Sequence, residues 1–124
     1  MRTIRITCGT VSIRAELLKT PTADAVWEAL PCASAARTWG EEVYFPVSIN
    51  AALEDTAKDV VEAGEIAFWT EGHCIAIGFG PTPISQEGEI RLAARTNVFA
   101  RALDDVTVLG GATDGAPVVV ARAN

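Results

Sequence analysis

The sequence predicts a mostly β protein, folded as one closed barrel of about eight strands with one or two short helices. Many short segments alternate apolar and polar residues with a period of two, which is typical of half-buried strands. Only one segment carries a clear helical stripe. Because many short strands would leave exposed edges in an open sheet, closure into a barrel is expected. A length of 124 residues provides one core but is too short for two ordinary domains, so we expect residues 1–124 to form a single domain.

Two strands and a hairpin are predicted at the start of the chain, in "TIRITCGTVSIRAEL". Alternate residues are apolar from Ile4 to Cys8 and again from Val11 to Leu17. The short gap at Gly9 and Thr10 makes an antiparallel hairpin the simplest connection.

A short amphipathic helix is predicted over residues 21–30, in "KTPTADAVWEALP". Thr20 can cap its first turn and Pro21 suits the first helical position. An apolar stripe at helical spacing continues to Leu30, and Pro31 ends the helix. We expect the stripe, including Trp27 as a core residue, to cover one open end of the barrel.

The middle of the chain is predicted to hold two short strands and a loop. In "RTWGEEVYF" (residues 37–45), "RTW" and "EVYF" are read as strands broken at Gly40, since a glycine inside a strand pattern usually marks a bulge or bend. Residues 50–63 lack a clean stripe, so they are read as a loop with one turn of helix.

The remaining segments predict a second hairpin and two further strands. "GEIAFWTEGHCIAIGFGP" returns to period two and gives the hairpin, and residues 81–94, rich in proline and polar residues, are read as a surface loop. "TNVFARAL" is read as a strand, "DDVTVLGGATDG" as a helical turn and a glycine-rich loop, and "APVVVARA" as a closing strand covered on both faces.

Charge and composition exclude several classes of function. The net charge of −6, without a basic cluster, argues against nucleic acid as a partner. No apolar run is long enough for a membrane span, and the first residues alternate as no signal peptide does, so a cytoplasmic protein that does not contact membranes is expected. Cys8, Cys32 and Cys74 have no zinc or CxxC spacing and are read as reduced, small buried hydrophobic residues.

The order of these segments resembles that of the cyclophilin barrel. "KTPTADAVWEAL" is similar to the helix that follows the first hairpin of cyclophilins, and "NVFARALDDVTVL" with "APVVVARA" is similar to their C-terminal part. "TWGEEVYF", "GEIAFW" and "GFGPTPIS" resemble more closely a family of small bacterial and archaeal cyclophilin-like proteins, which are single minimal barrels without an established activity. The resemblance implies a cyclophilin-like barrel over most of the chain.

The cyclophilin catalytic motif is only loosely matched. Cyclophilins carry an "FHR" strand followed by "GFMxQGG", which supply the catalytic arginine and a glutamine. Arg37 is the position that the resemblance matches to that arginine, but Ala36 stands in place of the histidine and no glutamine follows. Phe79 in "GFGPTP" is matched to an aromatic residue of the proline pocket. The resemblance therefore implies the fold more strongly than isomerase activity.

A ligand-binding groove on the outer face of the barrel is the candidate site. Arg37 and Trp39 lie two apart on one predicted strand, Glu42 and Tyr44 do so on the next, and Phe79 would lie beside them. Such a surface suits a small polar molecule or a peptide. The same pattern is also that of an ordinary strand corner, with packed aromatic rings and solvated charges, and the spacing alone does not separate these interpretations.

Other catalytic patterns are not found. Glu41 and Glu42 are adjacent on a strand, so they point to opposite faces and cannot flank one bond. His73 in "TEGHC" has no partners for a metal site or a catalytic triad and is read as a turn residue. "GFGPTP" is followed by prolines rather than by the helix that a phosphate-binding loop requires. No metal or cofactor is predicted.

Three functions remain open at this stage. The first is a binding protein that holds a small molecule or peptide in the groove, the second a weak prolyl isomerase using Arg37, and the third a structural subunit without ligand. The sequence decides neither whether the protein is an enzyme nor its oligomeric state.

Overall fold

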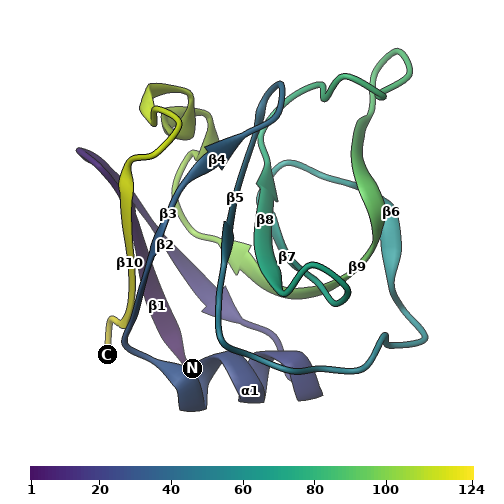
Figure 1. Ribbon diagram of the computed structural model, residues 1–124. Helices are drawn as coiled ribbons and strands as arrows, with labels where there is room; N and C mark the ends of the chain where they lie inside the picture. Colours follow the sequence, from purple (N-terminus) through teal and green to yellow (C-terminus); the bar gives the residue numbers. More distant parts are fainter.

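The computed structural model describes residues 1–124 and confirms a mostly β, nearly closed antiparallel barrel (Figure 1). It has ten strands and two short helices. The elements are β1 (Thr3–Cys8), β2 (Val11–Leu17), α1 (Pro21–Ala29), β3 (Cys32–Ala35), β4 (Arg37–Thr38), β5 (Glu42–Pro46), β6 (Lys58–Val61), β7 (Glu65–Trp69), β8 (Cys74–Gly78), β9 (Ile90–Ala102), the 3₁₀ helix η1 (Val106–Gly111) and β10 (Pro117–Arg122).

Nine of the strands follow one path around the barrel, in the order β3-β10-β1-β2-β9-β7-β8-β5-β4, and β6 pairs with β9 outside this path. The two ends of the path, β3 and β4, are consecutive in the chain. At this seam the Ser34 hydroxyl donates a hydrogen bond to the Pro46 carbonyl at 2.6 Å. The strands at the two ends of the path are not paired by backbone hydrogen bonds, and this side-chain hydrogen bond connects β3 to β5 at the seam.

The barrel interior is filled by the apolar positions that the period-two pattern indicated. Twenty-five buried residues form one continuous core. Three phenylalanines, Phe45, Phe68 and Phe99, are fully buried in it, and Ile4 and Ile6 of the first hairpin are as well. Burial of this apolar surface is the main force that holds the barrel closed.

Helix α1 forms and caps as predicted. The Thr20 side chain accepts a hydrogen bond from the Ala23 amide at 3.0 Å, and Pro21 occupies the first turn. The helix lies across one end of the barrel, and η1 lies at the opposite end (Figure 1). Val26 is fully buried, but Trp27 is only partly buried and is covered by the guanidinium group of Arg122, 4.4 Å from its ring centre. The prediction of Trp27 as a core residue is therefore wrong in part: one ring face is covered by a cation.

The strand β9 leaves the barrel halfway along its length. Its second half pairs with β7 inside the barrel wall, whereas residues 90–96 pair with β6. In Figure 1 this β6–β9 ribbon stands away from the barrel. A second cluster of four buried residues, Val61, Ala67, Ala76 and Leu92, fills the space between the ribbon and the outer face of β7 and β8. The ribbon thus adds a second layer outside the barrel.

Three predictions about single segments are corrected by this arrangement. Residues 58–61 form β6 and not a loop, because they pair with the outward half of β9. Residues 90–94, read as loop, belong to β9. Strand β10 is buried on one face only, with Val119 47% exposed. In addition, β3 was not expected as a separate strand and forms by pairing with β10.

A buried polar network ties the long connection before β6 to the rest of the fold. The side-chain Nδ2 of Asn97 donates hydrogen bonds to the Thr22 hydroxyl at 3.0 Å and to the Ala52 carbonyl at 2.9 Å. Its oxygen accepts one from the Glu54 backbone amide at 2.9 Å. Asn97 is fully buried, so these bonds replace water and link α1, residues 52–54 and β9.

Neither helix combines the length and the apolar character that a membrane-spanning helix needs.

Candidate functional site

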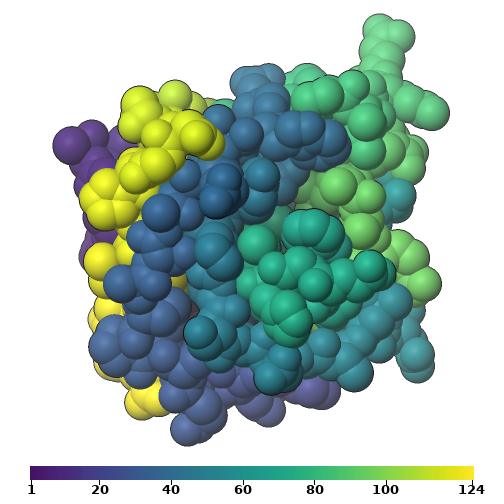
Figure 2. Space-filling view, viewed as in Figure 1, coloured from purple at the N-terminus to yellow at the C-terminus, as the bar shows by residue number.

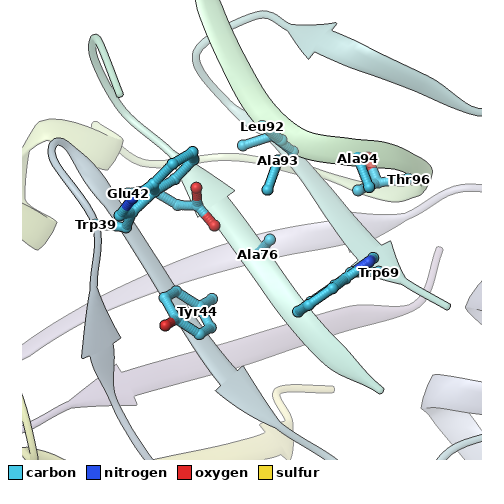
Figure 3. A pocket seen from close by; sticks show the side chains of 9 residues that line it. All are labelled: Trp39, Glu42, Tyr44, Trp69, Ala76, Leu92, Ala93, Ala94 and Thr96. Carbon is cyan, nitrogen blue, oxygen red and sulfur yellow. The ribbon is translucent and has the colours of Figure 1, made fainter. Parts of the chain in front are cut away.

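A pocket of about 170 Å³ lies on the outer face of the barrel, between the β5–β8 surface and the β6–β9 ribbon. We call it the outer pocket. On this face the β4–β5 segment, the β7–β8 hairpin and the segment leading into β9 come together (Figure 2). Nine residues line the pocket, most of them apolar: Trp39, Glu42, Tyr44, Trp69, Ala76, Leu92, Ala93, Ala94 and Thr96 (Figure 3).

Strand alternation places the lining side chains of β5 and β8 on one face. In the β5–β8 pair, Glu42 lies opposite Gly78 and Tyr44 lies opposite Ala76. Directly opposed residues point to the same face, and the residues between them, such as Val43, point into the barrel core. The small side chain of Ala76 leaves room between the rings of the aromatic residues, whereas the space over Gly78 is filled by the Ile90 side chain.

Trp39 is positioned by a tight turn between β4 and β5. Gly40 adopts a positive φ of 59°, and its Cβ position is closed by Pro81 and Pro83 at about 3 Å. A side chain there would collide with the loop that follows β8. The Trp39 amide then donates to the Glu42 carbonyl at 3.0 Å, which holds Trp39 beside the start of β5.

Glu42 is the polar residue at the centre of this wall. Only 6% of it is exposed, and its Oε1 atom is buried without a hydrogen-bond partner in the protein. The ion pairs of the structure are all made by other carboxylates. Burial without a counter-charge disfavours the ionised form and raises the pKa of Glu42 to about 7. At neutral pH the carboxyl can therefore either accept or donate a proton.

Trp69 faces Glu42 from across the pocket (Figure 3). Its indole Nε1 is also buried without a hydrogen-bond partner. The ring is held by the β7–β8 turn, where a Cβ on Gly72 would lie 2.1 Å from Trp69 Cε3, so the turn backbone packs directly on the ring. Two residues of the pocket wall, Glu42 and Trp69, thus each have one buried polar atom that the protein leaves unpaired.

Three of the five predicted site residues, Trp39, Glu42 and Tyr44, line the outer pocket. Arg37 does not. It lies opposite Tyr44 on β4, is exposed, and forms no ion pair with Glu42. The predicted arginine and the predicted carboxylate thus share a sheet face but do not form an ion pair.

Phe79 does not line the pocket either. It packs against the barrel core, and its ring lies near Gly110 of η1. The physical reason is parity: Phe79 continues the series of Ile75 and Ile77, both of which point inward. The strand pattern therefore directs Phe79 toward the core and away from the outer groove in which it is predicted.

Six lining residues were not predicted. Trp69 could have been found, because it alternates with the core residues Ile66 and Phe68 and so must point outward. Leu92 and its neighbours could not, since their place over the pocket depends on the pairing of the first half of β9 with β6.

A second hollow of about 380 Å³ lies at the seam between β3 and the chain after β5. Its walls are made of alanine, serine and short apolar side chains, with Cys32 as the one titratable group. No buried unpaired polar atom faces it. The outer pocket, though smaller, carries more specific chemistry.

Metal-binding geometry is not present: no three His, Cys, Asp or Glu side chains lie together as ligands. His73 is an exposed turn residue with a positive φ of 52°, and its Nδ1 lies 3.1 Å from the Ile49 carbonyl. The three cysteines are free, with Cys8 and Cys74 buried as predicted and Cys32 partly exposed.

The barrel, its end helix and the outer face describe a minimal cyclophilin-like domain. Residues 2–121 match the Cyclophilin-like family, and the chain belongs to this family. Among solved structures, it is similar to the hypothetical protein AF2241 from Archaeoglobus fulgidus, with 38% identity, a TM-score of 0.84, and coverage of 98% of this chain and 95% of that one. The resemblance seen in the sequence is thereby confirmed.

A more distant likeness is to McbB, whose structure was solved in complex with tryptophan. The TM-score is 0.74 with 14% identity, and 98% of this chain covers 45% of McbB. At this identity the likeness shows a shared fold. No curated protein matches the chain.

Proposed function

We propose that the protein binds a small ligand in the outer pocket. The observation that carries this proposal is the aromatic-lined cavity whose wall includes Glu42, a buried carboxyl group without a counter-charge in the protein. Leaving a buried polar group unpaired costs about 1–3 kcal/mol, and a ligand that pairs with it recovers that free energy. Small-molecule sites commonly combine apolar walls with a few such polar groups.

The size of the pocket limits the ligand. Pockets for drug-sized molecules are typically about 300–1,000 Å³, and the outer pocket has about 170 Å³. A compact molecule therefore suits it better than a long peptide. The distant relative McbB was solved with an amino acid bound, which supports small-molecule binding on this fold.

A thermal-shift screen of small compounds tests the proposal. A specific ligand at 100 times its Kd should stabilise the protein by about 2.7 kcal/mol. Ala93 is exposed at the pocket wall, so Ala93→Phe should fill the pocket and abolish the shift. The matched control is Ala33→Phe, an exposed alanine at the seam hollow, which should leave the shift unchanged.

Two outcomes would contradict the proposal. If no compound stabilises the wild type, the interpretation as a structural subunit without ligand is favoured. If Ala33→Phe abolishes the shift and Ala93→Phe does not, the seam hollow is the binding site.

A further inference from the structure

The lining of the outer pocket contains one acidic residue and no basic residue. Glu42 is the only group in the lining that can carry a negative charge near neutral pH, and no lysine or arginine lines the pocket to balance it. Three aromatic rings, Trp39, Tyr44 and Trp69, stand around it, and Figure 3 shows the carboxyl group directed into the space that they share. An anionic ligand would meet this carboxylate without a compensating cation.

Aromatic rings and a carboxylate together favour a cation. The faces of tryptophan and tyrosine rings attract ammonium groups, with a gain that increases when water is excluded. A carboxylate adds a charged hydrogen bond or a counter-ion contact. The alanine and leucine side chains of the remaining wall suit the apolar body of such a ligand.

We infer that the outer pocket binds a compact organic ammonium ion, with Glu42 as its counter-ion and the Trp39, Tyr44 and Trp69 rings around its charged end. This inference rests on the proposed function and names the class of ligand. It accounts for a carboxyl group in the pocket wall that has no cation partner in the protein, because the ligand supplies the counter-charge.

The alternative is a neutral ligand that accepts a hydrogen bond from protonated Glu42. The two cases differ in their pH dependence, since the pKa of Glu42 is raised to about 7. Binding of a cation requires the ionised carboxylate and releases its proton to water, so affinity should rise by about 100-fold from pH 5 to pH 8, about tenfold per pH unit below the pKa. A neutral acceptor should bind more weakly as pH rises.

Few other titratable groups near the pocket could change the pH dependence of ligand affinity. The neighbouring titratable groups are Tyr44 on the same strand, Arg37 on β4 and Cys74 on β8, and residues 92–94 and 96 of β9, which face the pocket, are not titratable. The shift of the Glu42 pKa is caused by burial. Tetramethylammonium, whose charge does not titrate, is therefore a suitable probe for the pH series.

The experiment measures the affinity of the full chain for two cations and two neutral molecules of similar shape by NMR titration. The pairs are benzylammonium with benzyl alcohol, and tetramethylammonium with 2,2-dimethylpropanol. We expect the cations to bind more tightly, tetramethylammonium to follow the pH dependence above, and Glu42→Gln to weaken cation binding by about 10- to 100-fold, as expected for loss of a charged contact. Glu41→Gln removes the same charge from an exposed neighbour and should have little effect.

The outcomes separate this inference from the proposed function. Equal or tighter binding of the neutral molecules, or unchanged cation affinity in Glu42→Gln, overturns the ligand class. If a neutral compound from the thermal-shift screen binds at the pocket while both cations do not, the ligand class is wrong and small-ligand binding stands. If no compound of the screen binds there, both fail.

Discussion

Burial of Glu42 makes the stability of the protein depend on pH in an unusual direction. Its carboxyl has an ordinary pKa of 4.5 and a pKa of about 7 in the folded protein. As pH rises, Glu42 therefore ionises in the unfolded chain before it ionises in the folded protein. The free energy of unfolding is highest below pH 4.5 and falls as pH rises to about 7. At 1.36 kcal/mol per pKa unit, the loss is about 3 kcal/mol.

Glu42→Gln should remove this dependence, because glutamine does not ionise. We expect the difference in the free energy of unfolding between the variant and the wild type to rise by about 3 kcal/mol, in favour of the variant, from pH 4.5 to pH 8.5. Urea unfolding at both pH values measures it. Glu41→Gln is the control and should show no such gain. An identical difference between Glu42→Gln and wild type at both pH values would show that the carboxyl is not perturbed.

Arg37 is placed poorly for prolyl isomerase chemistry. Rotation about the peptide bond has a barrier of about 18–20 kcal/mol, and an arginine can lower it only if it is held at the substrate. Arg37 is exposed and lies outside the outer pocket. We expect little or no catalysis in a protease-coupled or NMR exchange assay on a proline peptide. Rapid catalysis that Arg37→Ala abolishes, with the fold intact, would instead identify an enzyme.

Part of the site could be predicted residue by residue. The alternation of "TWGEEVYF" correctly places Trp39, Glu42 and Tyr44 on one face. Alternation also places Arg37 on that face. It does not tell where along the strand the pocket ends, and Arg37 lies outside the pocket. The unpaired state of Glu42 could not be predicted, because it depends on which segments cover the strand.

At the level of elements, the buried Asn97 network should be important for stability. Asn97→Ala would remove the partner of the Ala52 carbonyl and of the Glu54 backbone amide, and would leave the buried Thr22 hydroxyl with the Glu54 carboxylate alone. We expect a loss of about 2 to 3 kcal/mol in the free energy of unfolding, measured by chemical denaturation. Asn50→Ala, at an exposed position of the same connection, should change it by less than about 0.5 kcal/mol. Equal effects of the two variants would contradict this role for Asn97.

Elements with strong local signals were predictable, and elements that depend on distant pairing were not. Helix α1 has its cap, its proline and its apolar stripe in ten residues. Strand β3 consists of the small residues "CASA", which have little strand preference, and it forms because β10 provides a partner. Strand β6 likewise depends on the outward half of β9.

For the whole molecule, the barrel followed from the number and shortness of the strands, and the resemblance agreed with it. The outer pocket required one further fact, that β9 leaves the barrel wall and carries β6 over the β7–β8 surface. No local pattern encodes this bend. The outer pocket therefore forms where the β6–β9 ribbon packs over the barrel wall, and the sequence predicts neither the ribbon nor its place on the wall.

The three tryptophans allow ligand binding in the outer pocket to be observed residue by residue. Trp39 and Trp69 line the pocket, whereas Trp27 lies on α1 and packs against Arg122. We would record the indole N–H signals in a ¹⁵N–¹H spectrum during titration with compounds from the thermal-shift screen. If a ligand binds in the outer pocket, the Trp39 and Trp69 signals should shift and saturate while the Trp27 signal stays unchanged. A stabilising ligand that moves only the Trp27 signal, or no compound that moves the other two, would contradict binding in this pocket.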